Sequence, residues 1–180
     1  MNPMKILTIC LAIGMAVLMG CTSTPKAPDV AAQIRTALDQ AGLKDVSQSQ
    51  DRDKGVITLK GNVAVEADKT RAESIARTYA GAQVVSNQIA VLPPGSEGEA
   101  KKIYSALDNG IESNLEAALI AQRYKDLVKY SVKNGVVTLT GTVDSQEKRA
   151  YVQQVAAAVP NVQQVVNEIQ VKNQKATSTP

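Results

Sequence analysis

The sequence predicts an α+β protein made of two tandem copies of one small αββαβ unit, each a three-stranded mixed sheet with two helices on one face. First, a nine-residue segment that starts at Gly55 recurs eighty positions later at Gly135, with Gly-Val-x-Thr-Leu-x-Gly-x-Val in both copies. Second, apolar residues alternate within this segment and recur at helical spacing before and after it. Each helix and each sheet then has one apolar side, which packing of helix on sheet buries.

The duplication extends well beyond the central segment. It continues without a gap through a predicted helix and a final strand, where Ala72, Ile75, Ala76, Tyr79, Val85, Asn87, Ile89 and Val91 match Val152, Val155, Ala156, Val159, Val165, Asn167, Ile169 and Val171. Upstream, the apolar positions of a first helix match at an offset of eighty-one. We therefore expect one unit over residues 29–92 and a second over residues 108–172.

Each unit is expected to open with a helix and a β-hairpin. Asp29 and Asp108 precede the apolar stripes of the first helices and are predicted N-caps. In the second copy, the alternation before and after Asn134-Gly135 indicates a hairpin with a tight turn. The opening strand of the first copy, residues 46–51, is polar, so we expect it to be short or weakly held.

Two glycines and two asparagines in the repeat are predicted to have structural roles. Gly61 and Gly141 lie in the inward register of the second strand, where the missing side chain permits close approach of a packed helix. Asn87 and Asn167 lie in inward register among valines and isoleucines of the last strand. We expect each amide to bond the backbone at a strand edge or in a loop.

The segments outside the two units have their own signals. Pro93-Pro94-Gly95-Ser96 interrupts regular structure, so residues 93–107 are interpreted as a linker, whose part from 99 to 107 either forms an extra turn or extends the next helix. Residues 173–180 show no apolar periodicity and are expected to be disordered. Units of this size are small for independent cores, which predicts packing of the units on each other or on a membrane.

The N-terminus is predicted to be a signal peptide over residues 1–20. Lys5 precedes an uncharged run that would span only about 21 Å as a helix, too short for a bilayer core. Leu18-Met19-Gly20-Cys21 resembles the lipobox of bacterial lipoproteins, in which the cysteine carries the lipid. The resemblance implies lipidation of Cys21 and a tether over residues 21–28, and Thr22 in place of Asp implies sorting to the outer membrane, facing the periplasm.

Composition excludes several function classes. The chain has no His, Trp or Phe and two cysteines, of which Cys10 would leave with the signal peptide and Cys21 would be acylated. Imidazole chemistry and Cys/His metal sites are therefore excluded, and we expect no metal or cofactor other than the covalent lipid. The net charge of +3 comes from residues outside the two units, each of which is neutral, so nucleic acid is not an expected partner.

Both copies, with their Gly-Val-x-Thr-Leu-x-Gly-x-Val segment, a helix and then Val-x-Asn-x-Ile-x-Val, resemble the BON domain of bacterial envelope proteins. With the lipobox, the chain resembles the dual BON-domain outer-membrane lipoproteins. This resemblance implies a role in envelope integrity and osmotic-stress resistance, and contact of the domains with phospholipid. It also implies that the second helices make this contact, through Lys69, Arg71 and Arg77 in one copy and Lys148 and Arg149 in the other.

Two functional hypotheses follow. The first is a lipid-anchored, non-enzymatic envelope protein whose units contact anionic phospholipid or an envelope protein partner. The second is a periplasmic chaperone or scaffold that binds extended polypeptide by strand addition at a sheet edge, for which the polar strand at 46–51 is the suggestive feature. An enzyme is not expected, because carboxylates such as Asp51 and Asp144 lie in turns or at helix starts without a nucleophile, base or metal partner.

Overall fold

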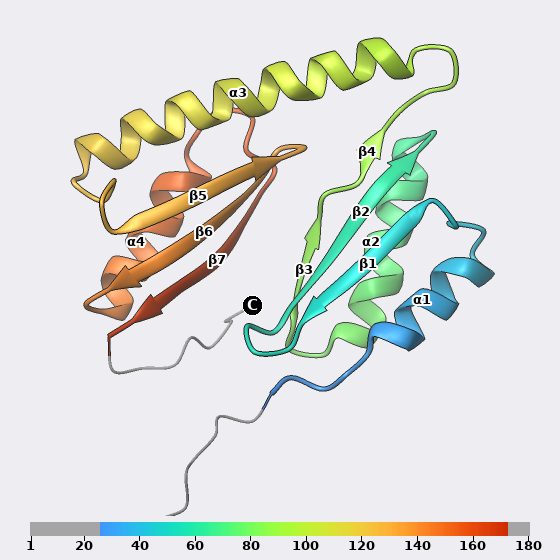
Figure 1. Ribbon diagram of the computed structural model, residues 1–180, viewed down its shortest axis with the longest axis horizontal. Helices are drawn as coiled ribbons and strands as arrows, with labels where there is room; N and C mark the ends of the chain where they lie inside the picture. Colours follow the sequence, from blue (N-terminus) through green and yellow to red (C-terminus); the bar gives the residue numbers. More distant parts are fainter. Residues whose placement is uncertain (1–25, 173–180) are drawn as a thin grey trace, which may run out of the picture.

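The computed structural model describes residues 26–172, which form two α+β units side by side beneath one long helix, α3 (Figure 1). The predicted fold class is confirmed. The predictions of a signal peptide over residues 1–20, of lipidation at Cys21 and of a disordered tail at 173–180 lie outside the described residues.

The first unit follows the predicted order of elements. Its helices and strands are α1 (Ala31–Gln40), β1 (Val46–Asp51), β2 (Val56–Val63), α2 (Glu66–Ala80), β3 (Val84–Asn87) and β4 (Ala90–Val91). β1 pairs antiparallel with β2, and β3 pairs parallel with β2 on its other side. β4 pairs with the end of β2 beyond β3, so β3 and β4 are two pieces of one interrupted edge strand. The parallel pairing requires the crossover that α2 provides.

The second unit repeats this arrangement with an uninterrupted last strand. Its elements are α3 (Glu97–Ala121), β5 (Val128–Lys133), β6 (Val136–Val143), α4 (Gln146–Ala157) and β7 (Gln164–Val171). β5 pairs antiparallel and β7 pairs parallel with β6. The hairpin turn is Asn134-Gly135, where both residues have positive φ, as the dipeptide predicted.

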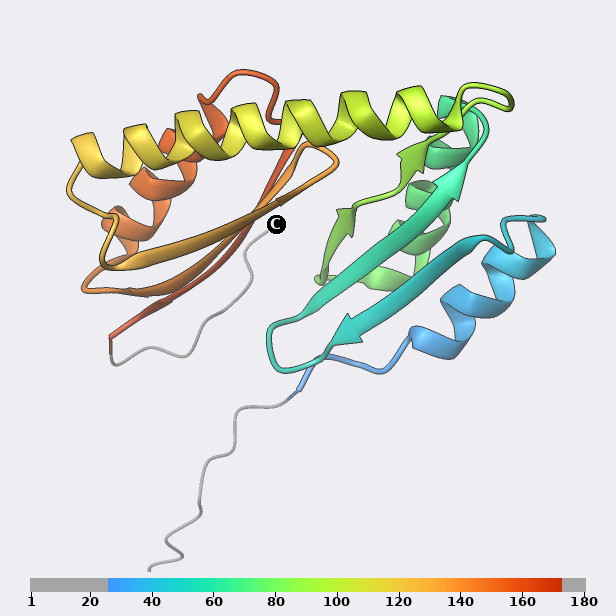
Figure 2. The same ribbon diagram turned by 45° about the horizontal axis from the view of Figure 1, so that its top comes forward.

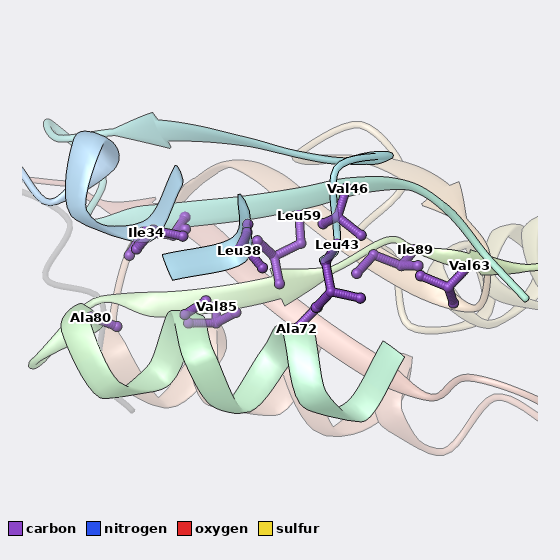
Figure 3. Close-up of a cluster of buried hydrophobic side chains, with 12 residues drawn as sticks. Ile34, Leu38, Leu43, Val46, Leu59, Val63, Ala72, Ala80, Val85 and Ile89 are labelled. Atoms are coloured by element: carbon purple, nitrogen blue, oxygen red, sulfur yellow. The ribbon is translucent and has the colours of Figure 1, made fainter. Parts of the chain in front are cut away.

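Each unit has its own hydrophobic core between the sheet and two helices. In the first unit, Ile34 and Leu38 of α1 and Ala72 of α2 point toward Val46 and Leu59 of the sheet (Figure 3). Corresponding residues of α3, α4 and the second sheet form the other core. These are the residues that the repeat placed on the inward faces. Burial of such side chains stabilises a fold by about 1.5–3 kcal/mol each.

The helix α3 differs from the prediction at its start. It begins at Glu97 and runs without interruption into the second unit, so most of the connection between the units is helical and residues 99–107 extend the next helix. The turned view shows α3 passing over both sheets (Figure 2). Asp108 is therefore not an N-cap. It lies in mid-helix, and its buried carboxylate accepts hydrogen bonds from the backbone N–H groups of Asn134 and Gly135, both at 2.9 Å.

Strand β1 is neither short nor weakly held, contrary to prediction. It has six residues, like β5, and pairs along its whole length with β2. Its polar side chains on the α1 side bond main chain near the start of that helix. Gln48 donates to the Ala31 carbonyl at 2.9 Å, and Gln50 accepts from Val30 N at 3.1 Å. β1 thus lacks the apolar alternation of a typical half-buried strand, but it is stabilised by its pairing with β2 and by side-chain hydrogen bonds to the start of α1.

The chain that enters the first unit is bound to the β1–β2 turn. Ala27 and Arg52 bond each other twice, from Ala27 N to Arg52 O at 2.9 Å and from Arg52 Nε to Ala27 O at 2.8 Å. The Pro28 carbonyl accepts from Gln50 at 2.6 Å, and Lys26 pairs with Asp53 at 3.2 Å. The last residues of the predicted tether, 26–28, are therefore part of the folded unit.

The two units pack directly on each other, which is one of the two alternatives that their small size left open. Val56 of β2, Val136 of β6 and Val166 of β7 form a buried cluster with Val84 against it. The Gln164 side chain on β7 donates to Val85 O at 2.7 Å and accepts from Asn87 N at 3.1 Å, both on the edge of β3. The Gln164 side-chain amide thus forms two hydrogen bonds with the backbone of β3, as the backbone of a paired strand would do.

Polar contacts join the hairpin of each unit to the last strand of the other. Lys54, after β1, donates to the Glu168 carboxylate on β7 at 2.7 Å. Asn134, in the β5–β6 turn, donates to the Gln88 carbonyl between β3 and β4 at 2.7 Å. Asn134 corresponds to Lys54 in the repeat and Glu168 to Gln88. The interface between the units is therefore approximately two-fold.

Candidate functional site

The basic residues predicted to contact lipid do not form one exposed surface. Lys69 and Arg149 occupy equivalent positions of α2 and α4, and their exposed fractions are only 6% and 9%. Arg71, Arg77 and Lys148 are exposed. Lys69 and Arg149 are thus not part of an exposed basic surface, and lipid contact through the second helices stays a prediction.

Arg149 instead holds the edge of β7. Its guanidinium donates to the carbonyls of Ile169 and Asn167, both at 3.0 Å, and its burial lowers its pKa. Lys69 lies near the interface between the units, where its ammonium is 3.4 Å from Gln163 Oε1. These cations satisfy internal polar groups, as buried charges must.

Two exposed cations of the second helices, Arg77 and Lys148, are paired with acids on the same helix or just before it. Arg77 donates to Glu73, and Lys148 donates to Asp144 at 2.8 Å. The hydrogen bond from Lys148, with that from Lys172, lowers the pKa of Asp144 to about 2. Burial alone would raise the pKa of Glu73, but hydrogen bonds from Asn87 and Arg77 outweigh it and lower that pKa. Pairing of this kind weakens the attraction of the helices for an anionic surface.

Asn87 and Asn167 have equivalent partners in the two units. Each side-chain oxygen accepts from the backbone N–H two residues later, Ile89 at 3.3 Å and Ile169 at 3.1 Å. Each amide nitrogen donates to the carbonyl of the buried cation of its unit, Lys69 or Arg149. The two asparagines thus bond main chain, joining the last strand to the helix beside it.

Gly61 and Gly141 are required by the backbone, but for a reason other than the predicted one. Their φ values are +120° and +131°, and an added Cβ would overlap the carbonyl oxygen of Asp45 or Leu127. The close neighbour is the loop that precedes the first strand of each unit, not a packed helix. Both the backbone conformation and the available space therefore exclude a side chain.

A group of exposed apolar residues lies at the C-terminal end of α3 and around it. Ile120, Leu127 and Tyr151 are 56%, 47% and 41% exposed. Tyr151 donates to Gln122 Oε1 at 2.8 Å, and its ring lies 6.1 Å from that of Tyr124. With the exposed cation of Arg123, which follows α3, we call these residues, Ile120, Arg123, Tyr124, Leu127 and Tyr151, the terminal patch.

Sequence reasoning missed the terminal patch, although a signal was present. The buried stripe of α3 uses Ile111, Leu115 and Leu119, so Ile120 falls outside it. Leu127 likewise precedes the alternation that begins at the buried Val128. Large apolar residues that do not fit the periodicity of their own element are candidates for an exposed contact surface.

A hollow of about 630 Å³ lies between the units under α3. The end of β2, the segment around β4, the N-terminal half of α3 and the β5–β6 turn all line it. Three lysines border this inter-unit cleft, namely Lys60, Lys101 and Lys133. Its size lies within the range of small-molecule sites.

Both units match the BON domain, over residues 26–93 and 107–173. The chain belongs to the BON-domain family. It is 32% identical over 146 residues to osmotically-inducible protein Y of Escherichia coli (strain K12), across 79% of this chain and 71% of that protein. It is also 29% identical over 124 residues to an uncharacterized protein in the gshII 5' region of Anaplasma centrale, across 68% of this chain and 80% of that protein.

A solved structure of CdsD, a structural protein of the type III secretion system of Chlamydia trachomatis, matches 80% of this chain and 92% of that chain. The TM-score is 0.35 and the identity 14%, a likeness too low to support an argument about this protein.

Several carboxylates of the two BON domains have structural partners. Asp51 Oδ1 accepts from the backbone N–H groups of Asp53 and Lys54, both at 3.1 Å. Across residues 26–172, no three His, Cys, Asp or Glu side chains come together as a metal site requires. Within the same range, no helix is long and apolar enough to cross a membrane.

Proposed function

We propose that this dual BON-domain protein is a lipid-anchored, non-enzymatic envelope-integrity protein that acts under osmotic stress and contacts phospholipid through its second BON domain. The observation that carries the proposal is the terminal patch, where exposed apolar side chains and the exposed Arg123 lie at the end of α3 and around it. The osmotic context comes from the relative in Escherichia coli, which is named for its osmotic induction. Location at the outer membrane, facing the periplasm, follows from the predicted lipobox and from Thr22.

The terminal patch suits a membrane interface because it combines two weak attractions. Ile120 and Leu127 are about half exposed, so their insertion contributes roughly 1 kcal/mol each. A cation such as Arg123 contributes about 1 kcal/mol on an anionic surface. A sum of this size is too small for lasting attachment but sufficient to orient a protein that a lipid already holds at the surface.

The lipid on Cys21 supplies that attachment in this proposal. Because Ala27 is bonded to the β1–β2 turn, only residues 22–26 separate Cys21 from a fixed residue. A segment of this length spans at most about 20 Å. The first BON domain is then held near the bilayer, while the second provides the orienting contact.

The anchor is tested by substitution in the full chain. Cys21→Ala should remove the protein from the membrane fraction and abolish incorporation of labelled fatty acid. Cys10→Ala is the matched control, because that cysteine lies in the predicted signal peptide, and it should leave both readouts unchanged. Incorporation of label into the Cys21→Ala variant would contradict lipidation at this position.

Phospholipid contact is tested with residues 22–180, which lack the anchor, by flotation with phosphatidylglycerol or phosphatidylcholine vesicles across a salt series. We expect salt-sensitive flotation on phosphatidylglycerol, lost in Ile120→Ser/Leu127→Ser and weakened in Arg123→Glu. Ile103→Ser/Leu107→Ser changes two other exposed apolar residues of α3 and should float like the unchanged protein. Equal flotation of all variants would show that the terminal patch is not the contact.

A further inference from the structure

We infer that the inter-unit cleft is a binding site for the phosphate ester of a small polyol, separate from the terminal patch. The cleft lies on the side of the molecule where α3 crosses from one BON domain to the other (Figure 2). Its volume of about 630 Å³ suits a ligand of this size. Nothing in the proposed membrane contact uses it.

The roof of the cleft is built by the part of α3 that has no counterpart in the first BON domain. α1 has 10 residues, whereas α3 has 25. The additional N-terminal turns contribute Lys101 and Tyr104 to the lining. Tyr104 fixes these turns to the first domain, because its hydroxyl oxygen accepts from Val91 N at 3.2 Å. The same hydroxyl keeps its own hydrogen available as a donor toward a ligand.

Positive charge converges on the cleft from three separate elements. Lys60 comes from β2, Lys101 from α3 and Lys133 from β5. All three are exposed, and none forms an ion pair with another residue of the described chain. Lys54 and Lys148, by contrast, have close carboxylate partners. Glu97, one turn before Lys101 on α3, attracts that lysine without forming a close ion pair, whereas Lys60 and Lys133 have no ion-pair partner among residues 26–172.

Two carboxylates, Asp108 and Glu112, also line the cleft, so three lysines and two acids leave it a net charge of +1. Asp108 is buried, and its two oxygens already accept from the backbone of Asn134 and Gly135. Glu112 is exposed. The remaining lining is rich in amides and hydroxyls, including Asn62 and Asn109. These groups hydrogen-bond hydroxyls of a polyol, while three cations match the charge and the several acceptor oxygens of a phosphate.

This chemistry occurs in soluble polyol phosphates and in the headgroup of phosphatidylglycerol, and one titration distinguishes the sources. Amide resonances of residues 22–180, which include every described residue, are followed by NMR as glycerol 3-phosphate is added, with glycerol as the uncharged control. We expect saturable shifts around Asn62, Ala90, Asn109 and Lys133 with the phosphate and none with glycerol. Displacement by phosphatidylglycerol vesicles would assign the headgroup as the source, and its absence would assign a soluble ester.

Lysine substitutions provide the decisive comparison. Lys60→Gln/Lys133→Gln should weaken glycerol 3-phosphate binding by about tenfold or more, since a charge-assisted hydrogen bond contributes about 1.5–3 kcal/mol. Lys44→Gln/Lys129→Gln removes two exposed lysines outside the cleft and should leave the affinity unchanged. No shift at the cleft, or equal affinity in both double variants, would overturn the inference. Ile120 and Leu127 lie outside the cleft, so failure of Ile120→Ser/Leu127→Ser to reduce flotation would contradict the proposed membrane contact without affecting this titration.

Discussion

The two BON domains have nearly the same interior and different peripheries. Twelve buried residues form each core, at largely corresponding positions, and the two hairpins pair in the same register. The peripheries differ in the length of the first helix, in the continuity of the last strand and in the residues at the hairpin turn. The repeated residues therefore determine the packing of each core, whereas the residues that differ determine how each domain contacts the rest of the protein.

The first strands illustrate this division. β1 directs Gln48 and Gln50 toward α1, where they bond the chain that enters the fold. β5 has Tyr130 and Val132 at the matching positions, and both pack against the core. The first domain thus uses this strand to fix its N-terminal segment, and the second uses it for apolar packing. Four predictions test how far the two domains are equivalent, from the largest effect to the smallest.

The largest effect is expected from alanine at Gly61 or Gly141. The new Cβ would overlap a backbone carbonyl, and the positive φ is strained for alanine, so each change should lower the free energy of unfolding by about 3 kcal/mol or more. Denaturant unfolding measures this. Gly110→Ala is the control, because its site in α3 is open, and it should be neutral or stabilising by up to about 1 kcal/mol. A mild effect at one position only would show that the domains tolerate strain differently.

The next largest effect is expected from Asp108→Ala, which should destabilise the second domain more than the first. It removes the acceptor of two buried backbone N–H groups in a turn that belongs to the second domain, at a cost of about 3 kcal/mol. Asp126→Ala changes an exposed carboxylate of the same domain and should stay within about 0.5 kcal/mol of the unchanged protein. Hydrogen exchange should show greater opening of β5 and β6 than of β1 and β2. Uniform loss of protection would mean that the domains unfold as one unit.

The buried cations should give a smaller and unequal effect. Arg149→Met removes two hydrogen bonds to β7 and should cost about 2 kcal/mol, whereas Lys69→Met removes one long contact and should cost less than about 1 kcal/mol. Thermal unfolding of the two variants provides the comparison. Equal losses would contradict the different roles that the structure gives these equivalent positions.

The smallest effect concerns acid stability. Because Lys148 and Lys172 lower the pKa of Asp144 to about 2, below its ordinary 3.8, its ionised form stabilises the fold. That contribution is complete above about pH 4 and is lost as the pH falls toward 2. Asp144→Asn should therefore reduce stability at pH 7 and make unfolding less sensitive to pH between 4 and 2. Asp126→Asn, at an exposed site, should keep the original pH dependence.

Periodicity and duplication were sufficient to predict the fold class, the order of elements and most of the core, because these depend on the spacing of apolar residues. Features that depend on a distant partner were predicted poorly. Asp108 has the sequence context of an N-cap, yet its acceptors serve a turn 26 residues away. Lys69 and Arg149 have the spacing of exposed helix residues, yet each is buried. Gln164 gave no local signal at all, since its partners lie on the other domain.

The reciprocal contacts between the domains bear on how such a chain arose. Lys54 and Asn134 occupy equivalent positions of the repeat, as do Glu168 and Gln88. The contacts Lys54–Glu168 and Asn134–Gln88 therefore join the same two positions, with the roles of the domains exchanged. That is the arrangement of an isologous dimer. Fusion of two copies of a one-domain gene would preserve such an interface and convert association between molecules into association within one chain, independent of concentration. After fusion the two halves need no longer be identical, so one could keep its bonds to the N-terminal segment while the other diverged.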